Sequence, residues 1–98
     1  MTPEGRVKFE IKKVLDDLGI WYFMPAANGF GKVGVPDFIC CWNGEFLAIE
    51  AKAPGKSDSL TPNQMARIQE IRNAGGLAFV IEDAKYLRKQ LTELYEVR

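Results

Sequence analysis

Apolar residues near the start of the chain recur every three or four positions, which predicts an amphipathic helix. The segment Thr2-Pro3-Glu4 is typical of a helix start, with a hydroxyl N-cap, a proline and an acid in the first turn. Gly19 is typical of the residue that follows the last turn of a helix. The stripe expected to face the core consists of Val7, Ile11, Val14, Leu15 and Leu18.

Two further helices are expected in the second half of the chain. Thr61-Pro62 repeats the helix start, and this helix is expected to run to about Ala74, just before Gly75-Gly76. Asp83 can cap a last helix over residues 84–94. The apolar residues expected to face inward from the middle helix are Met65, Ile68 and Ile71.

Four short apolar segments predict strands, at residues 20–24, 36–42, 45–52 and 77–81. The expected order of elements is therefore α-β-β-β-α-β-α, an α/β fold. A length of 98 residues favours a single domain over residues 1–98.

Asn43-Gly44 is the strongest short signal for a two-residue hairpin turn of type I′. Counting outward from such a turn places Asp37 directly opposite Glu50. Because side chains alternate along a strand, Lys52 lies on the same face as Glu50. A turn rule alone therefore brings two acids and a lysine together.

The acid pair would be costly as plain structure. Carboxylates opposite each other on a sheet face, roughly 5 Å apart at Cβ, repel each other. The two strands are otherwise apolar, so the acids are expected to be buried, where they need a compensating charge or become protonated. A divalent cation would supply that charge, and Lys52 would stabilise developing negative charge or orient a water. Two alternatives stay open: an internal salt bridge to Lys52, or solvated acids at the strand ends.

The composition narrows the chemistry further. The chain has 13 basic and 13 acidic residues, no histidine and two cysteines. Without histidine there is no Ser-His or Cys-His pair and no histidine-ligated zinc, so an oxygen-bound Mg²⁺ or Mn²⁺ fits best. The formal charge of zero argues against a basic nucleic-acid coat or a polybasic anchor.

The cellular setting follows from a few negative observations. No apolar stretch approaches the roughly 20 residues of a membrane span, and the first residues do not resemble a signal peptide. Cys40 and Cys41 would point to opposite faces of a strand and are expected to be buried thiols in a reducing cytoplasm. We therefore expect a cytoplasmic protein with no membrane contact.

Two polar residues stand near the apolar stripes of their helices. Glu4 points inward from the first helical turn, although an acid there is also favoured simply by the helix dipole. Gln64 shares a helix face with Ile68 and Ile71, near the helix start. Its amide would bind substrate or water beside the acids, or would equally well satisfy a loop backbone.

Taken in order, these residues resemble a known family. Gly34-Val35-Pro36-Asp37, then twelve residues, then Glu50-Ala51-Lys52 is similar to the PD-(D/E)xK nuclease signature. The chain more closely resembles a virus-type replication-repair nuclease (VRR-NUC) domain over about residues 2–82, in the manner of stand-alone phage or prophage members. The further matching segments are Thr2-Pro3-Glu4-Gly5, Gly29-Phe30-Gly31, Ala48 to Lys56, Thr61-Pro62-Asn63-Gln64 and Ala74-Gly75-Gly76.

The resemblance implies a restriction-endonuclease-like core, a mixed four-stranded sheet flanked by helices, and a metal-dependent DNA endonuclease. By this resemblance Asp37, Glu50 and the Ala51 carbonyl would bind Mg²⁺ or Mn²⁺, completed by Glu4. Lys52 would be the catalytic lysine, and Gln64 would lie beside the site. The phage-type relatives look like dimeric Holliday-junction resolvases, so branched DNA, a homodimer and, for a phage-encoded protein, a bacterial host cytoplasm are expected.

DNA contacts are less well indicated, because the chain is neutral overall. Lys32, Lys56 and Arg67 lie on or beside expected loops and could contact the phosphate backbone, or be ordinary solvated charges. Trp21, Tyr22 and Phe30 are candidate interface aromatics, although core burial is the favoured interpretation for the first two. A nuclease for flaps, nicks or single strands, or a non-catalytic DNA-binding module on the same fold, stays open as an alternative function.

Overall fold

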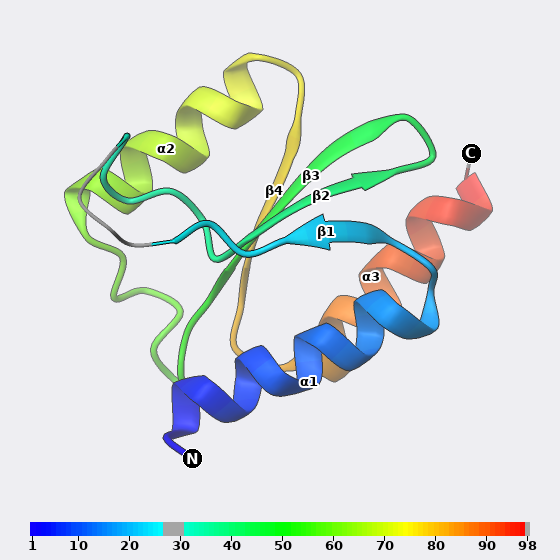
Figure 1. The fold of residues 1–98 in the computed structure, drawn as a ribbon, viewed down its shortest axis with the longest axis horizontal. Helices are drawn as coiled ribbons and strands as arrows, with labels where there is room; N and C mark the ends of the chain where they lie inside the picture. Colours follow the sequence, from blue (N-terminus) through cyan, green and yellow to red (C-terminus); the bar gives the residue numbers. More distant parts are fainter. Residues whose placement is uncertain (27–30, 98) are drawn as a thin grey trace.

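The computed structural model describes residues 1–26 and 31–97, and it contains three helices and four strands in the expected order (Figure 1). The elements are α1 (Pro3–Asp17), β1 (Trp21–Phe23), β2 (Phe38–Trp42), β3 (Glu45–Ala51), α2 (Pro62–Asn73), β4 (Leu77–Ile81) and α3 (Ala84–Val97). The first three strands are a little shorter than expected, the fourth has the expected bounds, and the last helix is longer.

The four strands form one mixed sheet in the order β1-β2-β3-β4. The first three strands pair antiparallel, and β4 runs parallel to β3 after the chain crosses over through α2. Figure 1 shows α1 and α3 together on one side of the sheet and α2 on the other. The expected fold class, a mixed four-stranded sheet flanked by helices, is therefore confirmed.

The first helix, α1, begins and ends where the sequence predicts. The Thr2 side chain accepts a hydrogen bond from the backbone N–H of Gly5 at 3.0 Å, which caps α1. Gly19 follows α1 with a φ of 67°, the left-handed conformation that glycine adopts most easily. Within the described part of the chain, no helix is long and apolar enough to cross a membrane.

The hairpin between β2 and β3 has the expected turn and register. Asn43 and Gly44 both have positive φ angles, 51° and 79°, as a type I′ turn requires. Trp42 pairs with Glu45 across the turn, and the pairing continues to Phe38 opposite Ile49. The register expected from the sequence is therefore confirmed as far as Phe38 and Ile49, one residue before the expected pair of Asp37 and Glu50.

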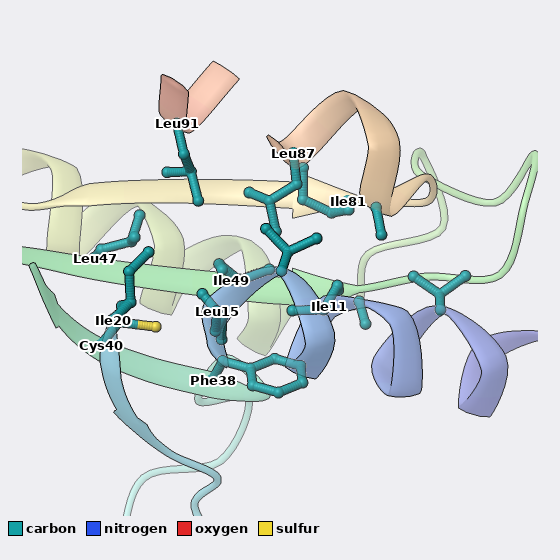
Figure 2. Close-up of a cluster of buried hydrophobic side chains, with 14 residues drawn as sticks. Ile11, Leu15, Ile20, Phe38, Cys40, Leu47, Ile49, Ile81, Leu87 and Leu91 are labelled. Atoms are coloured by element: carbon teal, nitrogen blue, oxygen red, sulfur yellow. The ribbon is translucent and has the colours of Figure 1, made fainter. Parts of the chain in front are cut away.

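The main core lies between the sheet and the helices α1 and α3. Figure 2 shows its side chains meeting between the helices and the sheet, with Ile11 and Leu15 on α1, Leu87 and Leu91 on α3, and Phe38 on β2. A smaller cluster on the opposite face packs Ile68 of α2 against Ala48 and Ala78. The small alanine side chains allow α2 to lie close to β3 and β4.

Three expectations about burial are wrong. Met65 is 56% exposed, because the stripe of α2 that faces the sheet runs through Gln64, Ile68 and Ile71, one position away from it. Trp21 is 64% exposed, and Cys41, its neighbour across the β1–β2 pairing, is an exposed free cysteine. Both lie at the end of the sheet face that α2 does not cover, whereas Cys40 points to the other face and is buried.

Candidate active site

The expected site residues meet where β3 ends. The chain leaves β3 at Ala51, passes beside the N-terminal end of α1 and continues to the start of α2 (Figure 1). Side chains from the entry of β2, the end of β3 and the first turn of α2 thereby come together.

Asp37 lies one residue before β2, directly beside the end of β3. Its Oδ2 atom accepts a hydrogen bond of 2.8 Å from the backbone N–H of Ala51. This bond orients the carboxylate toward β3 and fixes the position of Ala51 next to it. Asp37 therefore lies beside the end of β3, as the hairpin register predicts. It is held there by its side-chain hydrogen bond to Ala51 and not by a further pair of the strand ladder.

Glu50 is the buried acid of the pair, with only 4% of its surface exposed. Burial raises its pKa to about 8, and the negative charge of Asp37 adds to the effect. The nearby Lys52 ammonium acts in the opposite direction but does not outweigh them. At neutral pH this carboxyl group therefore holds a proton readily, unless a further positive charge stabilises its ionised form.

Lys52 follows β3 and is itself nearly buried, with 8% of its surface exposed. Its backbone N–H donates to the carbonyl of Ile81, which extends the pairing with β4. Its Nζ atom donates to Oε1 of Gln64 at 2.9 Å and lies 3.5 Å from the carbonyl of Ser59. The ammonium is thus held by neutral oxygen acceptors beside the acid pair.

Gln64 connects the start of α2 to Glu50 of β3 and to Lys52, which follows that strand. Its Oε1 accepts from Lys52 and also from the backbone N–H of Thr61 at 3.0 Å, while its Nε2 donates to Glu50 Oε2 at 3.3 Å. The Thr61 hydroxyl in turn accepts from the Gln64 N–H, which completes a capping box. Of the two roles that the sequence left open for this amide, the bond to a loop backbone is present at Thr61. The amide also lies beside the acids, and its binding of substrate or water stays a prediction.

The segment before Asp37 is pressed against the start of α2 at Gly34. A Cβ atom on Gly34 would lie 2.5 Å from the carbonyl carbon of Asn63, and its φ of +86° also favours glycine. No larger residue fits here without moving the backbone. This close approach holds the β2 entry, and with it Asp37, next to Gln64.

Glu4 lies in the first turn of α1, where its carboxylate contacts Lys8. The Lys8 Nζ atom is 3.4 Å from Glu4 Oε2 and 3.5 Å from Asp37 Oδ1, so one ammonium bridges two acids from different elements. Partial burial lowers the pKa of Lys8, but Asp37 and Glu4 outweigh that effect, and the net shift is upward. Lys8 is a site residue that was not predicted from the sequence. Its i, i+4 spacing from Glu4 could have indicated the first contact but not the second.

The donor chemistry suits a divalent cation only in part. Asp37 and Glu50 form a close pair of oxygen donors whose repulsion a cation would relieve. Among residues 1–26 and 31–97, however, no group of three or more acids or cysteines is close enough to hold a metal ion. The third expected carboxylate, that of Glu4, bonds to Lys8 instead. The residues therefore fit a cation at the acid pair, with Glu4 able to join only after its contact with Lys8 changes.

The basic residues expected to contact DNA are arranged around Glu70. Lys32 lies 3.2 Å and Arg67 2.7 Å from its carboxylate, and Arg67 also donates to the carbonyl of Val33. Lys56 is exposed in the loop after β3. A role of these three side chains in DNA binding stays a prediction.

The aromatic residues expected at an interface differ in exposure. Trp21 is largely exposed and packs edge-on against Phe23, whereas Tyr22 is half-buried beside Phe38. Phe30 lies outside the residues that the structure describes.

A family model described as the VRR-NUC domain matches residues 12–84. The match covers Asp37, Glu50, Lys52 and Gln64, but it begins within α1, so Glu4 and Lys8 lie outside it. No curated protein sequence matches the chain.

Proposed function

The chain belongs to the VRR-NUC family and is a nuclease of the DNA repair and replication type, and from this premise we propose a metal-dependent endonuclease that hydrolyses phosphodiester bonds in structured DNA. The observation that supports it most is the contact of the buried Glu50 with the partly exposed Asp37, with the nearly buried Lys52 beside them. A buried carboxyl beside a second, partly exposed one destabilises the metal-free fold and is useful where a cation joins the two. A non-catalytic DNA-binding module would have no need of this costly pair.

In this proposal Asp37 and Glu50 hold Mg²⁺ or Mn²⁺, with the Ala51 carbonyl and Glu4 as further ligands. When bound, such a cation polarises the scissile phosphate and activates water as a nucleophile. The Lys52 ammonium positions that water or stabilises the negative charge that develops on the phosphate. Gln64 holds Lys52 in place, since its amide oxygen accepts from the ammonium and its nitrogen donates to Glu50.

We further propose that the substrate is branched DNA, with a Holliday junction as the first candidate, and that the protein acts as a homodimer. A neutral protein gains little general attraction to phosphates, so two copies would supply more contacts and two active sites for a two-fold substrate. The uncovered part of the sheet, with Trp21, Phe23, Cys41 and Phe46 exposed, offers an apolar surface for a second copy.

The test is a cleavage panel with purified protein in Mg²⁺ or Mn²⁺, and in EDTA as a control. The substrates are a four-way junction, a flap, a nicked duplex, an intact duplex and a single strand. We expect metal-dependent cleavage that is strongest on the junction, together with a dimer in light scattering. Cleavage that persists in EDTA would contradict the metal dependence. Preferential cutting of flaps, nicks or single strands would favour the alternative substrates, and a monomer at micromolar concentration would count against a resolvase.

A further inference from the structure

The contact of Lys8 with Asp37 is a feature of the site that neither the sequence pattern nor the family match explains. Lys8 lies on α1 one turn after Glu4, and its side chain is 32% exposed. Its ammonium is 3.4 Å from one carboxylate on its own helix and 3.5 Å from Asp37 at the entry of β2. The Lys8 ammonium, with a single positive charge, therefore bridges two of the acids that are expected to bind a divalent cation.

Such an ammonium must affect a metal at the same carboxylates. Each Oδ or Oε atom that it contacts is less available as a ligand, and its positive charge repels a divalent cation nearby. Lysine suits this role because its flexible stem lets the charge move away without unfolding the helix. The absence of a three-acid metal cluster among the described residues agrees with it, because Glu4 is bonded to Lys8.

We propose that Lys8 is a counter-cation of the acid cluster that competes with the divalent cation for Glu4 and Asp37, and so sets how tightly the site binds metal. This inference rests on the proposed function, since it assumes that the acid cluster binds a divalent cation. Lys8 is a positioning residue in this account: it stabilises the arrangement of the acids before the metal binds and yields its place afterwards.

A plain structural role for Lys8 is the alternative. The salt bridge to Asp37 would then only tie α1 to the sheet. α1 is already held by a buried apolar stripe, Val7, Ile11, Val14 and Leu15, so its anchoring does not depend on Lys8. Replacing Lys8 should therefore leave the protein folded while changing its affinity for metal.

The experiment measures Mn²⁺ binding without DNA, by the loss of the free-ion electron paramagnetic resonance signal, so that no activity is involved. Lys8→Met should bind Mn²⁺ more tightly than the unmodified protein, by a factor on the order of ten, because a like charge is removed next to the ion. Lys8→Arg should retain the weaker binding. Lys12→Met, which removes the same charge from an exposed position on α1, should change little because that charge is screened by salt.

A second readout is the melting temperature of the same variants in EDTA and in Mn²⁺. Lys8→Met should melt at a lower temperature than the unmodified protein in EDTA, and Mn²⁺ should raise its melting temperature by more. A structural role alone would lower both temperatures equally. Lys8→Gln, which keeps a polar end, carries the same expectations if Lys8→Met does not fold.

The outcomes separate this inference from the proposed function. Equal affinities of Lys8→Met and the unmodified protein would overturn the role of Lys8 and leave the metal site intact. An equally large effect of Lys12→Met would also overturn it, because a general charge effect would explain both. Binding by Lys8→Met but not by the unmodified protein would support competition while contradicting metal dependence of the natural chain. Binding by neither would overturn both proposals.

Discussion

The two faces of β3 carry opposite kinds of residue. Leu47, Ile49 and Ala51 point into the cluster with α1 and α3 and are fully buried among apolar side chains. Ala48 and Glu50 alternate with them and face α2. One strand of seven residues thus contributes to the main core on one side and to the candidate active site on the other.

The contrast between the two faces shows how a small domain can remain folded although its candidate site is destabilising. The face toward α1 and α3 is sealed by a large apolar cluster, whereas the face toward α2 is covered only in part and has a smaller one. A buried acid pair on the first face would have no partner able to compensate it. On the second face, Lys52, Gln64 and the open end of the sheet supply polar groups and access.

The largest difference in stability is expected between matched isoleucine truncations on the two faces. Ile49→Ala should lower the free energy of unfolding by about 4 kcal/mol, because it leaves a cavity in the fully buried cluster. Ile68→Ala on α2 should cost about 2 kcal/mol, since its smaller cluster can relax. Denaturant unfolding monitored by circular dichroism measures both, and an equal or larger loss for Ile68→Ala would contradict the comparison.

The second prediction concerns the pH dependence of the metal-free protein. Because the pKa of Glu50 is raised from 4.5 to about 8, the folded state keeps a proton between these values that the unfolded state has released. Stability should therefore fall as the pH rises through this window, by at most about 1.4 kcal/mol for each pH unit. Glu50→Gln should remove this fall and be more stable than the unmodified protein at pH 8.

Urea unfolding in EDTA at several pH values from 5 to 8.5 measures this slope. Glu93→Gln removes an exposed carboxylate from α3 and serves as the charge-matched control, with the same slope as the unmodified protein. Parallel curves for Glu50→Gln and the unmodified protein would show that Glu50 is not the group that titrates.

The smallest effect is expected at the cap of α2. Thr61→Ala removes the hydroxyl that accepts from the Gln64 N–H and should cost about 1 kcal/mol of stability. Because the same turn orients the Gln64 side chain toward Lys52, cleavage should also fall by a few fold. Thr61→Ser keeps the hydroxyl and should restore both. Normal cleavage by Thr61→Ala at a temperature where it is folded would show that the cap of α2 does not affect the active site.

The elements and the central acid pair were predictable because they depend on local rules. Asn43-Gly44 determined the hairpin register, and the register placed Asp37 beside Glu50. The family match then supports the nuclease assignment over residues 12–84. Gln64 was also found from its place on the buried stripe of its helix.

Burial and contacts between distant elements were not predictable in the same way. Trp21 is exposed because α2 covers only part of its sheet face, and Met65 because it lies one position off the stripe of α2 that faces the sheet. Both depend on how α2 is placed against the sheet. The contact between Lys8 and Asp37 depends on how α1 lies against the β2 entry. Such contacts follow from tertiary packing. The sequence therefore indicated the acids but not the Lys8 ammonium that lies between Glu4 and Asp37.

The most direct test of the account is the effect of Lys52→Met on DNA cleavage in Mg²⁺, measured together with its unfolding curve. The account predicts cleavage reduced by about a hundredfold or more with the fold retained, since the ammonium beside the acid pair is lost. Lys85→Met, at an exposed position on α3, should cleave normally. Undiminished cleavage by folded Lys52→Met would contradict the central claim that this buried cluster is the active site.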